Sequence, residues 1–185
     1  DVERSRGLGD VYKRQESTIS FIDGYHSKLY YRGYTIEDIA KYTTFEETTY
    51  LLLYGELPTR KQLDDFAGWL REERELPPQL VDLLYEIPGD VEPTEMLRTA
   101  VSYLGNLDPG RRDMSREGIY RKAIRLIAKM PTIVAYFYRV INDLELVEPD
   151  PTLSHAENFL YMFHGEKPSK LHGEAMDLSL KLYAV

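Results

Sequence analysis

The sequence predicts a mainly α-helical fold with a small β-hairpin near its N-terminal end. Apolar residues recur at helical spacing through most of the chain, above all between Arg116 and Asn142. Ser or Thr residues in capping patterns precede these stretches, and Gly or Pro follows many of them. The only strong strand signal is the pair of segments STISFID and KLYYRG, residues 17–23 and 28–33, which flank a turn at Asp23-Gly24.

Capping patterns predict the helices that follow the hairpin. Thr44-x-x-Glu47 and Thr59-x-x-Gln62 are capping boxes, and Gly55 can end the helix that the first box begins. The charged end of the second of these helices, REERE at residues 71–75, is predicted to form a solvated face. Prolines separate the next two helices. The predicted helices of this region cover residues 35–42, 45–54, 60–75, 79–87 and 93–104, and a loop is expected over 105–113.

The stretch from Arg116 to Asn142 is the longest predicted helix. Its first half is amphipathic, whereas Met130–Ile141 is apolar almost all round. A helix without a solvated face must be surrounded by other helices, so we expect this half to lie in the core. Pro131 has no N–H to donate and crowds the carbonyl of Ile127, which predicts a kink.

Two further helices are predicted near the end of the sequence. Thr152 is expected to cap the first, which runs to Phe163. The second follows Pro168 and carries an apolar stripe at spacing i, i+4, i+7, i+11, formed by Leu171, Ala175, Leu178 and Leu182. No stop signal precedes Val185, so we expect this helix to be cut by truncation.

Composition restricts the class of protein. The chain has 185 residues, 43% of them hydrophobic, and a net charge of −8, which argues against a nucleic-acid partner. No apolar run reaches membrane-spanning length, so no membrane partner is expected. The absence of cysteine excludes disulfides and thiolate nucleophiles and is compatible with the cytoplasm, the compartment we expect. Residues 1–15 show no periodicity; we expect a non-native leader, with a natural mobile N-terminus as the alternative.

Chemical motifs are scarce. No two of the four histidines are four residues apart, so no metal site is predicted, and no Gly-rich phosphate loop or G-x-S-x-G elbow occurs. His155 is expected to be neutral or hydrogen-bonded in the first turn of its helix. Residues 111–129 hold seven basic residues against two acidic ones, a local net charge of +5. This cluster either pairs with acidic neighbours or is a site for an anion or an acidic surface.

Several segments resemble the N-terminal part of the citrate synthase family of the bacterial and archaeal type. They are ESTISFIDG, LYYRGYTIEDIA, TFEETTYLLLYGELPT, EMLRTAVSYLG, AIRLIAKMPTIVAYFYR and EPDPTLSHAENFLYMFHGEKP. The resemblance covers about residues 16–185 in order, and the combination of YRGY, LLLYGELP and SHAENFLYM makes it specific. 2-Methylcitrate synthases share the same features.

The resemblance implies an almost wholly helical enzyme with a large and a small domain that acts as a homodimer. Such an enzyme condenses acetyl-CoA, its co-substrate, with oxaloacetate and water to give citrate and CoA, without a bound cofactor. Residues 16–185 would then be the truncated N-terminal part of the large domain. A non-catalytic helical dimerisation or interaction module is the alternative.

No catalytic, cofactor-binding or metal residue is predicted in this chain. None of the histidines, arginines or the aspartate that the family uses matches a position here, so the chain alone is expected to be inactive. Leu171-His172-Gly173 echoes a catalytic L-H-G triplet of the family but lies too early and lacks the small residues expected around it. The family implies a homodimer contact through helices 93–104 and 116–142, at Met96, Leu97, Ala100, Val101, Leu104, Ile127, Met130 and Val134.

Overall fold

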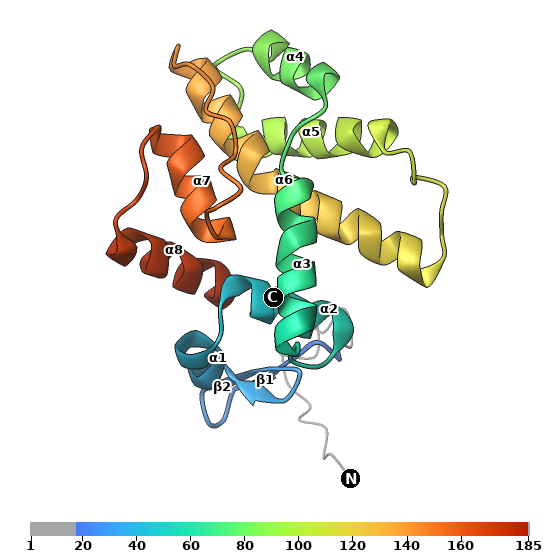
Figure 1. Ribbon diagram of the computed structural model, residues 1–185, viewed down its shortest axis with the longest axis vertical. Coiled ribbons are helices and arrows are strands. Elements are labelled where there is room, and N and C mark those ends of the chain that lie inside the picture. The colour runs from blue at the N-terminus through green and yellow to red at the C-terminus, as the bar shows by residue number, and fades with distance from the viewer. Residues whose placement is uncertain (1–17, 185) are drawn as a thin grey trace.

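A long central helix organises the fold, and the remaining helices pack around it (Figure 1). The structure is a computed structural model and describes residues 18–184. Residues 1–15 lie outside this range, so their assignment as a foreign leader stays a prediction. In the described residues, no helix is long and apolar enough to cross a membrane.

The predicted hairpin is present and has one additional short strand. β1 (Ser20–Asp23) pairs antiparallel with β2 (Lys28–Tyr31), and β2 pairs antiparallel with β3 (Tyr34–Thr35). Gly33 between β2 and β3 has a φ of 92°, a left-handed conformation that only glycine adopts without strain. The two-residue β3 was not predicted, because so short a strand carries no periodic signal.

Eight helices follow in the described part of the chain. They are α1 Ile36–Tyr42, α2 Phe45–Tyr54, α3 Arg60–Glu72, α4 Pro78–Glu86, α5 Pro93–Leu107, α6 Arg116–Ile141, α7 His155–His164 and α8 Lys170–Leu182. The predicted caps are confirmed: Thr44 and Thr59 form capping boxes at the starts of α2 and α3, and Gly55 is left-handed at the end of α2. The fold class is therefore mainly α, as predicted.

Several helix ends differ from the prediction. α3 ends at Glu72 rather than at residue 75, and α4 is shifted by one residue to Pro78–Glu86. α5 continues to Leu107, because Gly105 is accommodated within the helix instead of ending it. α7 is capped by Ser154, which forms a capping box with Glu157, while the Thr152 hydroxyl donates to the Asp150 carboxylate instead. α8 ends at Leu182 rather than running on to the end of the chain.

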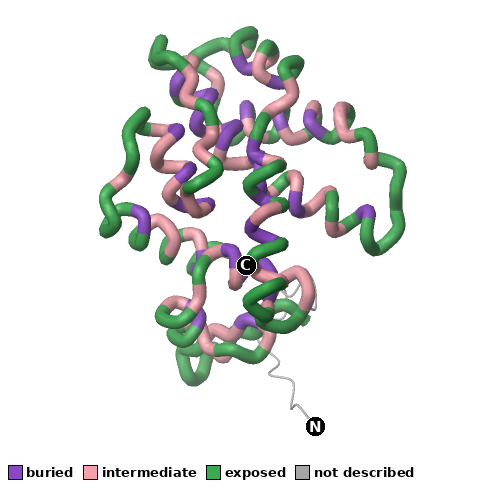
Figure 2. The backbone as a smooth tube through the Cα atoms, viewed as in Figure 1, coloured by how far each residue is buried: buried purple, intermediate pink, exposed green. Residues whose placement is uncertain are grey.

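The second half of α6 lies in the main hydrophobic core, as its all-round apolar sequence predicted. Its buried residues Ile133, Tyr136 and Phe137 pack against α4 and α5. Buried parts of the backbone gather where these helices meet (Figure 2). The ribbon of α6 changes direction near its middle, and Pro131 lies inside the helix, in agreement with the predicted kink (Figure 1). The α4 and α5 side chains of this core are Leu80, Leu84, Met96, Ala100 and Leu104.

The first half of α6 belongs to a second core with α2 and α3. It contributes Ile124 and Ala128, which pack against Tyr50, Phe66 and Leu70. Because one continuous helix enters both cores, α6 couples the α4–α5 part of the fold to the α2–α3 part.

Candidate functional site

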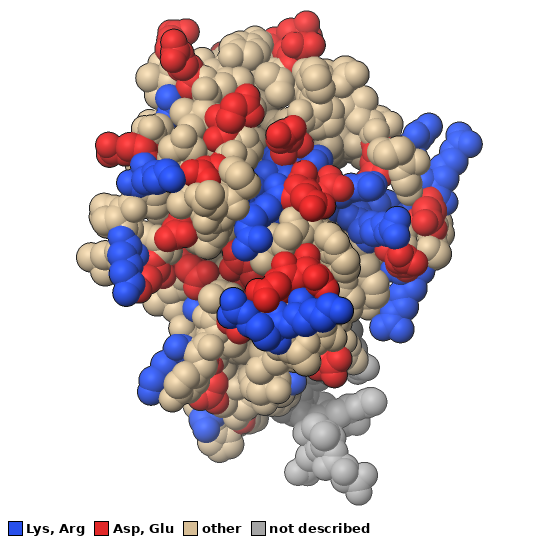
Figure 3. Space-filling view, viewed as in Figure 1, with Lys and Arg blue, Asp and Glu red and all other residues tan. Residues whose placement is uncertain are grey.

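The basic segment 111–129 covers the loop between α5 and α6 and the first half of α6. Lys and Arg side chains gather over this region in the space-filling view (Figure 3). The contacts made by each cation determine whether its charge is available to a ligand.

Glu73 at the end of α3 neutralises two of these cations. Its carboxylate accepts from Arg125 Nε at 3.1 Å and from Lys129 Nζ at 3.1 Å. Arg125 also donates to Asp108 at 3.0 Å. Burial by itself would raise the pKa of Glu73, but the hydrogen bonds from Arg125 and Lys129 outweigh it, and the net pKa is lowered. Glu73 is therefore ionised at neutral pH and cancels charge in the basic segment.

Most other cations of the segment also have partners. Arg121 pairs with Glu117 one helical turn away. Lys122 donates to the Asp113 carbonyl at 2.6 Å, and Arg116 donates to the Tyr120 hydroxyl. The prediction that the basic cluster pairs with acidic neighbours is confirmed for Arg121, Arg125 and Lys129, whereas Lys122 and Arg116 bond to neutral oxygens.

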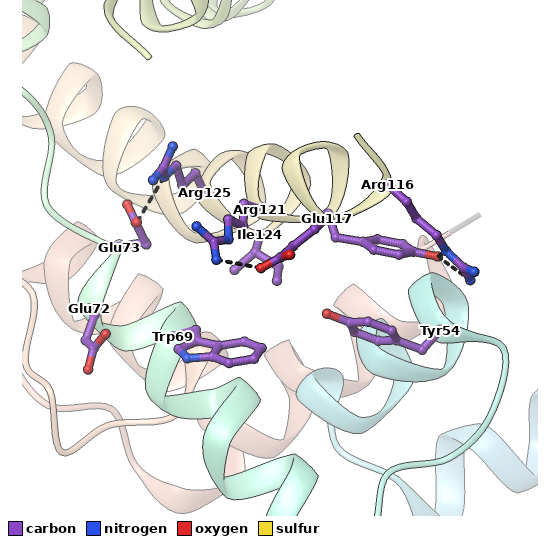
Figure 4. Close-up of a pocket in the computed structure, with 10 residues that line it drawn as sticks. Tyr54, Trp69, Glu72, Glu73, Arg116, Glu117, Arg121, Ile124 and Arg125 are labelled. Atoms are coloured by element: carbon purple, nitrogen blue, oxygen red, sulfur yellow. Dashed lines mark hydrogen bonds and ion pairs between the residues drawn. The ribbon is translucent and has the colours of Figure 1, made fainter. Parts of the chain in front are cut away.

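A cavity of about 570 Å³ lies between α2, α3 and α6 (Figure 4). Trp69 from α3 and Tyr54 from α2 face α6, and the Tyr54 and Tyr120 rings contact each other with centroids 4.9 Å apart. Its charged lining consists of Arg116, Arg121 and Arg125 with Glu72, Glu73 and Glu117. Since three positive charges face three negative ones, this cavity offers an anion no net attraction.

A second cleft, of about 480 Å³, lies on the α5 side of α6. Its wall is apolar and includes Val101, Leu107 and Leu126. Its charged lining consists of Arg111, Lys122, Arg125 and Lys129 with Glu73 and Asp108. The ion pairs of Glu73 and Asp108 already occupy Arg125 and Lys129, and the remaining excess of charge lies on exposed or half-exposed side chains.

His155 begins α7 in a buried position and is not arranged for proton transfer. Its ring stacks on Phe45 with centroids 4.7 Å apart, and its backbone N–H donates to the Glu46 carboxylate at 2.8 Å. Burial, together with the nearby charge of Arg74, lowers the pKa of His155 to about 3. The ring is therefore neutral at pH 7, as predicted, and serves packing.

The other histidines are exposed. His26 pairs with Asp23 in the hairpin loop, and His164 and His172 lie on the surface at α7 and α8. No group of three metal-ligating side chains occurs among the described residues. His172, the histidine of the L-H-G triplet, is exposed in the first turn of α8.

Arg74 has a structural role that the sequence did not predict. It lies in the REERE segment, which was predicted to be solvated, yet its exposed fraction is 2%. Its guanidinium donates to the carbonyls of Asp150 and Leu153 at 2.8 and 3.0 Å. Burial lowers the pKa of Arg74 to about 10, so the side chain remains charged at neutral pH. The prolines on either side of Asp150 could have indicated this contact, because that connector cannot satisfy its carbonyls with a regular ladder.

Comparison with known proteins identifies the family. The family model described as "Citrate synthase, C-terminal domain" matches residues 8–184. The chain belongs to the citrate synthase family. The citrate synthase of Haloferax volcanii is 41% identical over 98% of this chain and 49% of its own length, and the 2-methylcitrate synthase of Shewanella oneidensis is 40% identical over 91% and 44%.

Solved citrate synthases share the fold. The structure from Pyrobaculum aerophilum matches with a TM-score of 0.88 and 40% identity, over 92% of this chain and 45% of that one. A structure of the Thermoplasma acidophilum citrate synthase in complex with carboxymethyl coenzyme A and oxaloacetate matches with a TM-score of 0.86 and 29% identity. The chain spans about half the length of the relatives it matches.

The residues predicted at a citrate synthase dimer contact divide into two groups. Met96, Ala100 and Leu104 are buried within this chain, in the core with α4 and α6. Their side chains would not be reached by a partner without opening that core. The half-buried members, which a partner can touch, are Leu97, Val101, Ile127, Met130 and Val134.

Proposed function

We propose that this chain is part of an enzyme that condenses acetyl-CoA with oxaloacetate and water to give citrate and CoA. The observation that carries the proposal is the match to the Pyrobaculum aerophilum citrate synthase, at 40% identity over 92% of the chain. The Thermoplasma acidophilum relative was solved with a coenzyme A analogue and oxaloacetate, which supports the same pair of substrates. The reaction needs acetyl-CoA as co-substrate and no bound cofactor, and we place it in the cytoplasm.

In this proposal the chain supplies scaffold rather than catalytic groups. The only buried histidine in the described residues, His155, is neutral and packed on Phe45. The arginines of the basic segment are held in ion pairs or lie at the surface. Enolisation of a thioester requires an acid and a base beside the substrate. We therefore expect the isolated chain to be inactive.

We also propose that the enzyme is a homodimer in contact through α5 and α6. The accessible apolar residues on these helices, led by Leu97 and Val101, would form a two-fold contact in which the same patch is used twice. Charged groups are rare at the centre of such contacts, which suits the apolar side of α5 rather than the basic first turns of α6.

The acyl donor distinguishes a citrate synthase from a 2-methylcitrate synthase. 2-Methylcitrate has one more carbon than citrate, so its synthase needs propionyl-CoA where citrate synthase needs acetyl-CoA. Relatives of both kinds match at similar identity, 41% and 40%. We propose acetyl-CoA as the donor.

Release of CoA tests the proposed reaction and the proposed acyl donor. The chain is assayed alone and together with the part of the Pyrobaculum aerophilum enzyme that has no counterpart in it, with oxaloacetate and either acyl-CoA. We expect release above a heat-treated control only in the combined sample, and faster release from acetyl-CoA. Release by the chain alone would contradict its proposed inactivity. Preference for propionyl-CoA would indicate 2-methylcitrate synthase, and no release in any sample would contradict the proposed reaction.

A further inference from the structure

Of the five methionines in the chain, all of which lie within the described residues, only Met114 is exposed. Its exposed fraction is 73%, whereas Met96 and Met162 have 2% and 0%, and Met130 and Met176 are half-buried. The sequence has no cysteine, so no thiol competes for an oxidant that attacks sulfur. A hydroperoxide that reaches this chain therefore meets the sulfur of Met114 first.

Met114 lies in the loop between α5 and α6, at the edge of the fold (Figure 1). The residues on both sides of it are held against the first turn of α6. Ser115 accepts from the Gly118 N–H as the cap of α6, and the Asp113 carboxylate accepts from the Ser115 N–H at 2.9 Å. A Cβ at Gly118 would lie 2.3 Å from the carboxylate carbon of Asp113, so glycine at this position allows the close approach. The backbone around Met114 therefore has a defined position relative to α6.

Lys122, one turn further along α6, places a cation beside this sulfur. Its Nζ lies 3.9 Å from Met114 Sδ and donates to the Asp113 carbonyl at 2.6 Å. An ammonium has three N–H groups, so these two contacts leave a third donor for a further oxygen. Negative charge that develops next to the sulfur would therefore meet a positioned cationic donor.

We propose that Met114 is a modification site, at which a hydroperoxide oxidises the thioether to a sulfoxide and Lys122 both assists the transfer and binds the product. A sulfur lone pair attacks one peroxide oxygen, an S–O bond forms and the O–O bond breaks. The second oxygen leaves with the electron pair of that bond and takes up the proton lost by the transferred oxygen, so hydrogen peroxide yields water. Sulfur loses two electrons and the peroxide gains two. The Lys122 ammonium stabilises the negative charge on the leaving oxygen and is itself unchanged.

The sulfoxide oxygen is a stronger hydrogen-bond acceptor than the thioether sulfur, and Lys122 is close enough to donate to it. This bond adds a contact between the α5–α6 loop and α6. Because most of the Met114 side chain lies in solvent, its oxidation removes little packing, in contrast to oxidation of Met96 or Met162 in the interior. The modified chain is therefore expected to remain folded, with an α5–α6 loop that is held more tightly.

Rates of sulfoxide formation by hydrogen peroxide test the site. The native chain is treated both folded and in urea, and mass spectrometry of proteolytic peptides gives the rate at each methionine. N-Acetylmethionine amide in every sample corrects for the effect of urea on the reaction. Lys122→Gln removes the cationic donor, and Lys122→Arg retains one. The matched control is Arg112→Gln, which removes an exposed cation of the same loop. Circular dichroism establishes that each variant is folded.

We expect Met114 in the folded chain to react at least tenfold faster than Met130 or Met176. Its rate should also exceed that of Met114 in the unfolded chain at least threefold, because exposure alone cannot raise the rate above the unfolded value. Lys122→Gln should abolish this acceleration, whereas Lys122→Arg and Arg112→Gln should keep it. Faster reaction at another methionine, a folded-chain rate no higher than the unfolded one, or an acceleration that persists in Lys122→Gln would each overturn the proposal. The comparison of the folded and unfolded native chain needs no substitution.

Hydrogen exchange measures the contact made by the product. In the chain oxidised at Met114, exchange should slow at least twofold at the amides of residues 110–115, and this slowing should be absent in oxidised Lys122→Gln. Met114→Leu, which cannot form a sulfoxide, should show no change in this loop after treatment. Unchanged or faster exchange in the oxidised native chain would overturn the proposed binding of the product by Lys122. Neither measurement uses substrates, so both are independent of the proposed reaction.

Discussion

Buried polar side chains attach the connector between α6 and α7 to the rest of the fold. Arg74 reaches it from the end of α3 and donates to the carbonyls of Asp150 and Leu153. Asn158 accepts from the Asp150 N–H, and Lys167 pairs with the Asp150 side chain. The hydrogen bond and charge of Lys167, with the contacts of Thr152, hold the pKa of Asp150 well below its usual range. A segment without regular secondary structure is ordered by these contacts.

Arg74→Met should destabilise the chain, because it leaves the two carbonyls buried without a donor. We expect a loss of about 2–4 kcal/mol in the free energy of unfolding, measured by denaturant titration. Arg71→Met is the matched control, because Arg71 is exposed in the last turn of α3, three residues before Arg74. Losses of similar size in the two variants would show that the contact with the connector contributes nothing.

Stability should fall in mildly acidic solution because of His155. Its pKa is about 3 in the folded chain and about 6.5 when unfolded, so the unfolded state binds the proton first. The stabilisation is present above pH 6.5 and is lost as the pH falls towards 3, by about 2 kcal/mol at pH 5. Interactions in the folded chain lower the pKa values of Asp150 and Glu73, so these groups titrate below pH 5. The change in stability between pH 6.5 and 5 is therefore assigned to His155.

Unfolding measured between pH 7.5 and 5 checks this prediction. His155→Gln should flatten the pH dependence, whereas His172→Gln, at an exposed position, should not. An unchanged slope in His155→Gln would mean that another group controls acid stability.

At the scale of elements, the cap of α7 is Ser154 rather than the predicted Thr152. Ser154 accepts from the Glu157 N–H, and Glu157 accepts from the Ser154 N–H. Ser154→Ala should therefore cost about 1 kcal/mol of unfolding free energy. Thr152→Ala, whose hydroxyl contacts only the Asp150 side chain, should cost less than half of that. Thermal melts of the two variants decide, and a larger loss in Thr152→Ala would restore Thr152 as the cap.

At the scale of the whole molecule, the proposed dimer contact can be separated from the core beneath it. Val101 is half-buried on α5, whereas Ala100 beside it has no exposed surface. Val101→Glu should weaken association at least tenfold in sedimentation and leave the circular dichroism spectrum unchanged, because an unpaired charge would enter the contact. Ala100→Glu should instead unfold the α4–α5–α6 core. A Val101→Glu chain that associates as the native chain does would contradict the α5 contact.

Local patterns predicted most of the fold because they act within a few residues. Capping boxes at Thr44 and Thr59 and the left-handed Gly55 specify where α2 and α3 begin and where α2 ends, without help from distant parts of the chain. The placement of α6 in the core followed from its apolar second half. The start of α7 and the ends of α3 and α5 were predicted wrongly, because neighbouring residues offered more than one acceptable cap or stop.

By itself, the sequence determined the helical class, the hairpin, the central helix and the family. Each depends on the period and chemistry of neighbouring residues or on an ordered set of motifs. Only the tertiary structure decided which charges are buried and which apolar faces are covered. Arg74 and Lys181 are buried because distant carbonyls need donors, and the apolar stripe of α8 is exposed because Lys181 and Asp177 hold the helix by its other face. Such outcomes depend on partners more than fifty residues away in the chain, which no local pattern records.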